Sequence, residues 1–172
     1  MTGELEPKPA AASSSTLIRW MGIEDANSAG NVHGGAVMKL CDEAAAIAAI
    51  RHCGQKVVTA AMDRMTFNEP VHLGELLALS ASVNAVWRTS MEIGVRVEAE
   101  NARTGAKRHT STAYLTMVAI GDDNEPATVR GLILETETEQ RRNREAETRR
   151  RNRLAERDEI LGSRREDRRS SS

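Results

Sequence analysis

Hydrophobic and polar positions alternate in three stretches of the chain, and this is its clearest periodic signal. The stretches cover residues 77–87, 91–99 and 109–120, and nearly every second residue in them is apolar. Such alternation is typical of β-strands that bury one face and expose the other. Short polar connections at 88–90 and 101–106 separate the stretches, so we predict consecutive antiparallel hairpins.

Residues 35–53 carry a different pattern, in which apolar residues leave almost no polar face. This predicts a helix that other elements enclose, ending just before Gly54. Its apolar members are Val37, Leu40, Cys41, Ala44, Ala45, Ile47, Ala48 and Ile50. Asp42 lies in the middle of this helix, where a carboxylate is costly unless it is paired, hydrated or chemically employed. Asp42 is therefore the first candidate functional residue.

The order of the predicted elements indicates the fold class. Residues 13–23 and 57–67 also fit strands, so the chain reads as one strand, one helix and then four strands. A sheet with one apolar face needs a cover, and the helix at 35–53 is the only apolar one. We predict an α+β domain over residues 13–134 whose antiparallel sheet wraps around this helix. Residues 1–12 are predicted to be a disordered leader, and 135–172 a charged, partly helical tail.

Composition excludes several classes of function. The net charge of -1 and an aromatic content of 2% argue against nucleic-acid binding. The arginine cluster at 149–153 is interleaved with acids, which favours a solvated helix face over an anion site. Cys41 and Cys53 lack metal or redox spacing, so we expect no metal and a reducing compartment. Without a signal segment or a long apolar run, we expect a cytoplasmic protein with no membrane insertion.

Two motifs at the start of the central helix suggest a family. Residues 31–35 read Asn-Val-His-Gly-Gly, and residues 38–43 read Met-Lys-Leu-Cys-Asp-Glu. With Ser-Met-Glu-Ile at 90–93 and Thr-Gly-Ala-Lys at 104–107, they are similar to the hotdog-fold cytosolic acyl-CoA thioesterases of the brain acyl-CoA hydrolase type. The resemblance covers roughly residues 13–140. It implies a hotdog fold, hydrolysis of fatty acyl-CoA in fatty acid metabolism, and no cofactor apart from the CoA of the substrate.

The resemblance also implies an assembly. In two-domain members of that family, one repeat supplies an asparagine and the other an aspartate to a site at their interface. Here Asn31 and Asp42 stand in a single repeat. Two chains are therefore expected to replace the two repeats, with a homodimer as the minimal unit and a hexameric trimer of dimers as the full assembly.

The expected catalytic residues are Asn31, Asp42 and Gly35. Backbone N–H groups of Gly35 and Ala36 would polarise the thioester carbonyl, while Gly34 allows close approach. Asp42 would activate a water that Asn31 of the other chain helps to hold, and direct attack by the carboxylate stays open. The alternatives are an ion pair of Asp42 with Lys39 or a tail arginine, and a turn role for Asn31.

Substrate binding adds residues at the strand connections. Cations and backbone donors there could reach the phosphates of CoA, although loop arginines are often only solvated. The candidates are Arg88, Thr89, Ser90, Lys107 and Arg108, together with Gly34 and Ala36 at the helix start. A non-catalytic acyl-CoA-binding or scaffold protein stays open, as does a hotdog hydratase or dehydratase, which the lack of a histidine beside Asp42 disfavours. The sequence leaves the preferred acyl chain length undetermined.

Overall fold

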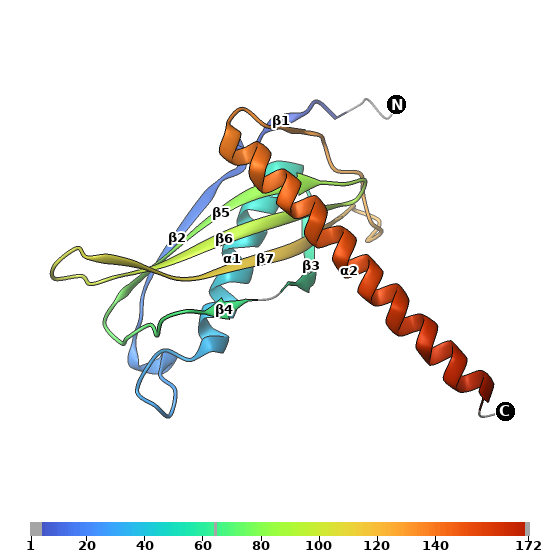
Figure 1. Cartoon of the computed structure of the whole chain (residues 1–172). Coiled ribbons are helices and arrows are strands. Elements are labelled where there is room, and N and C mark those ends of the chain that lie inside the picture. The colour runs from blue at the N-terminus through green and yellow to red at the C-terminus, as the bar shows by residue number, and fades with distance from the viewer. Residues whose placement is uncertain (1–4, 64, 171–172) are drawn as a thin grey trace.

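A curled antiparallel sheet wraps around helix α1 (Gly34–Cys53), and a second helix, α2 (Glu137–Ser170), crosses the outer face of the sheet (Figure 1). The computed structural model describes residues 5–63 and 65–170. The strands are β1 (Lys8–Pro9), β2 (Ser15–Trp20), β3 (Lys56–Met62), β4 (Thr66–Phe67), β5 (Leu76–Val86), β6 (Ser90–Glu100), β7 (Lys107–Ile120) and β8 (Leu132–Ile133). Two 3-10 turns, η1 (Ala11–Ser13) and η2 (Ile23–Asp25), flank β2.

The main sheet has the strand order β2-β5-β6-β7-β3, with β4 also paired to β7. All of these pairs are antiparallel. Leu79 of β5 lies opposite Val97 of β6, and both side chains are fully buried against α1 with Leu115 of β7. The predicted alternation, the hairpins and the α+β architecture with a central helix are therefore confirmed.

Helix α1 is less enclosed within one chain than its sequence predicts. Val37, Leu40, Cys41, Ala44, Ala45, Ala48 and Ala49 are buried as expected. Met38, Ile47 and Ile50, however, expose 41%, 38% and 47% of their surface. The helix ends at Gly54 in a left-handed conformation (φ 71°), as predicted. Three large apolar side chains of α1 are thus left partly uncovered by the sheet of their own chain.

The expectation of a disordered leader is wrong for residues 8–12. Strand β1 pairs in parallel with β8, and Lys8 donates its Nζ to the carbonyl of Arg51 at the end of α1. Ala10 is buried at 2% exposure. The segment consists only of Lys, Pro and Ala, and its order comes from a partner strand more than a hundred residues away along the chain. Residues 1–4 of the predicted leader lie outside the described residues.

The tail is helical, as predicted, but its first half is not simply solvated. Thr136 caps α2 by accepting the Glu139 N–H at 3.2 Å, and Glu139 accepts the Thr136 N–H in return at 2.9 Å. Ala146 is fully buried against the sheet, Arg149 forms an ion pair with Glu92 of β6, and Arg153 forms one with Asp63 just after β3. The second half of α2 extends beyond the sheet (Figure 1). Neither α1 nor α2, as far as the structure describes the chain, is apolar enough over its length to cross a membrane.

Candidate active site

A pocket of about 290 Å³ lies beside the first turn of α1. It is lined by Asn27, Asn31, Val32, Gly34, Val37, Phe67, Asn68, Glu69, Pro70 and Val71. Two of these residues, Asn31 and Gly34, were expected at the site. The amide oxygen of Asn31 lies 2.9 Å from Nδ1 of His72, so this side chain is held in a fixed direction.

Asn27 organises the loop that carries Asn31. Its side-chain oxygen accepts the N–H groups of Ala29 at 2.9 Å and of Asn31 at 3.1 Å, while Gly30 takes a positive φ of 81°. This is the Asx type of turn that asparagine favours. The sequence identifies Asn27 only as a turn former, and its place in the pocket becomes visible only in the structure.

The N–H groups at the start of α1 are largely occupied. Gly35 donates to Nδ1 of His33 at 2.9 Å, and Ala36 donates to the His33 carbonyl at 2.9 Å. No acceptor for the Gly34 N–H lies within residues 5–63 and 65–170. A Cβ at Gly34 would lie 3.4 Å from the Phe67 ring, which is ordinary van der Waals contact, so packing within this chain does not itself require glycine here. Both expected donors, Gly35 and Ala36, are therefore occupied by His33, and the N–H that is available instead belongs to Gly34, which was expected only to allow close approach.

Asp42 is half-buried and is held by a residue that the sequence analysis missed. Thr59, on strand β3, donates its hydroxyl to Oδ1 of Asp42. Lys39 pairs instead with Glu43 at 3.8 Å, and in the part of the chain that the structure describes no lysine or arginine forms an ion pair with Asp42. The alternative role of Asp42 as a salt-bridge partner is therefore not what this structure shows. The carboxylate keeps acceptor capacity for another donor.

One chain does not bring Asn31 and Asp42 together. Asp42 follows Gly34 by two turns, which places it about 12 Å along the helix axis from the pocket. A single water bridges groups only when both lie within hydrogen-bond reach of it. Within one copy, the two expected catalytic side chains therefore cannot act on the same reacting atom.

The expected CoA-binding residues fall into two groups at opposite ends of the sheet. Arg88 and Thr89 precede β6 and Ser90 begins it, whereas Lys107 and Arg108 open β7 opposite the other end of β6. The length of β6 separates these ends by roughly 30 Å. Lys107 pairs with Glu100 at 3.2 Å. The two groups therefore cannot hold the phosphates of one CoA molecule within one chain.

Arg108 is engaged in an ion pair of its own. Its guanidinium donates two hydrogen bonds to the carboxylate of Glu75 and also contacts Glu69 at 3.1 Å. These bonds raise the pKa of Arg108 and lower that of Glu75. Most of its donors are thus already used by the protein.

The cysteines have no catalytic environment. Burial, with the nearby charge of Asp42, raises the pKa of Cys41 to about 12, so its thiol is neutral and unreactive. Cys53 is buried as well, and its pKa is also raised by burial. Among the described residues, no group of three or more histidines, cysteines or acids could hold a metal ion.

Comparison with known proteins adds an independent line of information. Residues 29–106 match the family model of the Thioesterase superfamily. The cytosolic acyl coenzyme A thioester hydrolase of Rattus norvegicus is 35% identical over 139 residues, which cover 80% of this chain and 36% of that protein. The chain therefore spans about a third of the length of that relative.

Several solved structures match this chain over nearly their whole length. An apo-hexameric acyl-CoA thioesterase superposes with a TM-score of 0.85 at 34% identity, covering 88% of this chain and 97% of that chain. An acyl-CoA hydrolase from Staphylococcus aureus, solved with coenzyme A as an asparagine-to-alanine mutant, superposes with a TM-score of 0.86 at 30% identity, covering 92% and 95%. The same hydrolase has been solved as an aspartate-to-alanine and as a threonine-to-alanine mutant.

Proposed function

Because the chain belongs to the thioesterase superfamily, we propose that it hydrolyses acyl-CoA thioesters to a fatty acid and CoA. The observation that carries this proposal is Asp42, a half-buried carboxylate on an apolar helix that is oriented by Thr59 and has no cationic partner among the described residues. A carboxylate in such a setting is suited to accept a proton from water. The names of the relatives, which are acyl-CoA thioester hydrolases, support the same reaction.

In the proposed reaction, Asp42 takes a proton from a water that attacks the thioester carbonyl. The Gly34 N–H of a second copy, at the positive end of its α1, would stabilise the oxyanion that forms on the carbonyl oxygen, because Gly34 of the same chain lies about 12 Å from Asp42 along the helix. Collapse of this intermediate breaks the C–S bond and releases CoA as a thiolate, which then takes a proton. Direct attack by the Asp42 carboxylate, with an anhydride intermediate, is the rival route.

We propose that two copies of the chain complete each site. Asp42 contacts β3, which is an edge strand of the sheet. Both elements carry exposed apolar side chains, namely Met38, one turn before Asp42, with Ile47 and Ile50 on α1, and Val58 on β3 with 51% exposure. Exposed apolar patches of this kind mark interaction surfaces. A second copy packed here would carry its own asparagine loop to Asp42, and the hexameric relative supports further assembly into a trimer of dimers.

Asn27 competes with Asn31 for the asparagine role. The three residues mutated in the Staphylococcus aureus hydrolase are an asparagine, an aspartate and a threonine. Asn27, Asp42 and Thr59 reproduce that series with the same intervals along the chain, whereas Asn31 lies too close to Asp42 to do so. Asn27 also lines the pocket at the start of α1. We therefore extend the proposed catalytic set to Asn27 and Thr59.

The phosphates of CoA are proposed to lie near Arg88. Lys107 and Arg108 are already paired with carboxylates, as described above. Arg88 is exposed and forms no ion pair within the described chain, and its neighbours Thr89 and Ser90 add hydroxyl donors. A guanidinium with free donors binds phosphate oxygens in a bidentate manner.

Release of free thiol from a panel of acyl-CoA esters tests the proposed function. Wild type should release CoA, and Asp42→Ala should be inactive while still folded. Glu43→Ala is the matched control, because it removes the neighbouring carboxylate, whose only ion pair among the described residues is the exposed contact with Lys39. A folded Asp42→Ala variant with wild-type turnover would refute the proposed mechanism.

Mixing inactive variants tests the shared site. If the asparagine and Asp42 come from different chains, an equal mixture of Asp42→Ala with the critical asparagine variant should regain up to about a quarter of wild-type activity after subunit exchange. Asn27→Ala and Asn31→Ala are mixed separately, so the pair that recovers identifies the partner residue. A site contained in one chain would show no recovery in either mixture.

A further inference from the structure

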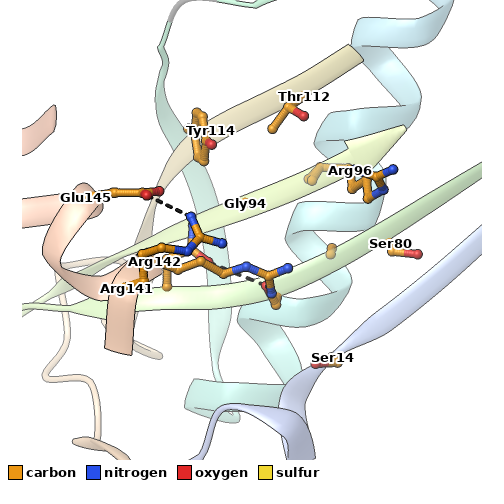
Figure 2. A pocket seen from close by; sticks show the side chains of 13 residues that line it. Ser14, Ser80, Gly94, Arg96, Thr112, Tyr114, Arg141, Arg142 and Glu145 are labelled. Carbon is orange, nitrogen blue, oxygen red and sulfur yellow. Dashed lines mark hydrogen bonds and ion pairs between the residues drawn. The ribbon is translucent and has the colours of Figure 1, made fainter. Parts of the chain in front are cut away.

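A second pocket lies on the sheet face away from α1, beneath the first turns of α2 (Figure 2). Its volume is about 320 Å³. Arg141 and Arg142 reach into it from α2, while Arg96 and Tyr114 enter from β6 and β7 (Figure 2). None of the residues expected at the active site lines this pocket.

The lining carries an excess of positive charge. Three arginines and one glutamate line the pocket. Arg141 pairs with Glu145 at 2.7 Å, and Arg96 pairs with Glu98 at 3.0 Å. Arg142 contacts only the hydroxyl of Ser82 at 3.4 Å, and no carboxylate among the described residues forms an ion pair with it. Arg142 therefore faces the cavity with no ion pair among the described residues, and the acid whose pKa its charge helps to lower, against the opposing effect of burial, is Glu139, one turn earlier on α2.

Hydroxyl groups lie beside these arginines on the sheet. Ser80 of β5 is in register with Arg96 of β6, which is in register with Thr112 of β7. Cross-strand neighbours in register point to the same face, so the two hydroxyls flank Arg96. Tyr114 is two residues further along β7 and lies on that face too. Donors from three strands and one helix thus converge on one cavity.

The docking of α2 does not account for this arrangement. The helix is held by other contacts: Asn143 donates to the Asn84 carbonyl at 2.9 Å, Arg149 pairs with Glu92, and Ala146 is buried. Arg142 adds only its long contact with Ser82. A side chain that only covers the surface would extend its guanidinium into solvent. Here it is half-buried and directed into the cavity.

We propose that this pocket binds a small phosphate-bearing anion. Arginine forks match phosphate oxygens in a bidentate geometry, and flanking hydroxyls satisfy the remaining acceptors. The cavity has the size of a small-ligand site. Because it lies on the other side of the sheet from Asp42 and Thr59, the ligand is not the reacting thioester, and the proposal does not depend on the proposed reaction.

Titration calorimetry on the full chain with inorganic pyrophosphate and with ADP tests the proposal. Wild type is expected to bind pyrophosphate, and Arg142→Gln is expected to weaken binding at least about tenfold, since a charge-assisted bond is lost. Arg144→Gln is the matched control, because it removes the same charge from an exposed arginine of α2 that does not line the pocket. Ser80→Asp places a negative charge in the pocket from β5 and is expected to abolish binding.

Each outcome decides the proposal. Absence of binding of both probes to wild type would overturn it, as would equal weakening by Arg142→Gln and Arg144→Gln, which would indicate only diffuse attraction. If Arg142→Gln loses helix content, Ser80→Asp decides in its place, and retained binding by that variant would overturn the site. Tighter binding of ADP than of pyrophosphate identifies a nucleotide, and equal binding identifies the phosphate groups alone.

Discussion

The ion pair between Arg149 of α2 and Glu92 of β6 allows a stability prediction to be worked out from the structure. Glu92 has 0% side-chain exposure, and its two oxygens accept Nε of Arg149 at 3.1 Å and a terminal nitrogen at 2.7 Å. Asn84 adds a third hydrogen bond at 3.1 Å. Arg149 also lies 3.6 Å from the centre of the Tyr114 ring. Burial alone would lower the pKa of Arg149, but the bonds and charge of Glu92 raise it.

Arg149→Ala should destabilise the protein strongly. It leaves the Glu92 carboxylate buried with Asn84 as its remaining partner, and breaking a buried ion pair costs roughly 3–5 kcal/mol. Because the Arg149 side chain is 22% exposed, water can enter the space it vacates. We therefore expect a loss near the lower end, about 3 kcal/mol of unfolding free energy.

Urea unfolding at a fixed protein concentration measures this loss. Arg144→Ala, an exposed arginine on the same helix, should change the unfolding free energy by less than about 0.5 kcal/mol. Replacing both partners, as in Glu92→Leu with Arg149→Met, should restore most of the stability, because no charge is left unpaired. A loss below about 1 kcal/mol for Arg149→Ala, or a double variant no more stable than the single one, would refute the reasoning.

Three further predictions concern the site and the response to acid. Thr59→Ala should lower kcat for thiol release about tenfold or more with little change in KM, and Thr59→Ser should retain activity. Equal loss in both variants would show that the hydrogen bond from the Thr59 hydroxyl to Asp42 does not support catalysis. Burial lowers the pKa of His52 from its ordinary value of 6.5, so the unfolded chain binds a proton more readily and stability should fall as the pH drops below about 6.5; His52→Gln should flatten this step in urea midpoints between pH 5 and 8. The hydrogen bonds of Arg108 lower the pKa of Glu75 from 4.5, so its stabilisation is complete above that pH and is lost as the pH falls through the lowered value; an unchanged acid limb in Glu75→Gln would contradict this assignment.

The sheet and the central helix were predictable because their signals are local. Leu79, Val97 and Leu115 are apolar members of period-two runs, and each is buried on the inner face. Gly54 ends α1 as its position in the sequence indicates. Pairing of β1 with β8 is a contact between distant segments, and nothing in the composition of residues 1–12 indicates it.

The site was predictable only where a residue conflicts with its surroundings. Asp42 is conspicuous because a carboxylate interrupts an apolar helix, and this conflict can be seen in the sequence itself. Thr59 does not stand out, since threonine is an ordinary strand residue and its role depends on where β3 lies against α1. Asn27 has the composition of a turn, and its pocket position depends on the fold of the loop around it.

The tail shows that the pattern of charges along the sequence does not reveal which of its arginines form ion pairs with the rest of the domain. The arginines at 149–153, with acids such as Glu147 and Glu156 on either side, fit a solvated helix, and the exposed second half of α2 agrees with that. Arg149 and Arg153 differ from their neighbours only in what lies beneath them, namely Glu92 on β6 and Asp63 after β3. Neither carboxylate is near the tail in sequence, so the pairing becomes visible only once the sheet has brought both acids under one helix. A buried acid on the outer face of a predicted sheet therefore indicates a covering element that carries the opposite charge.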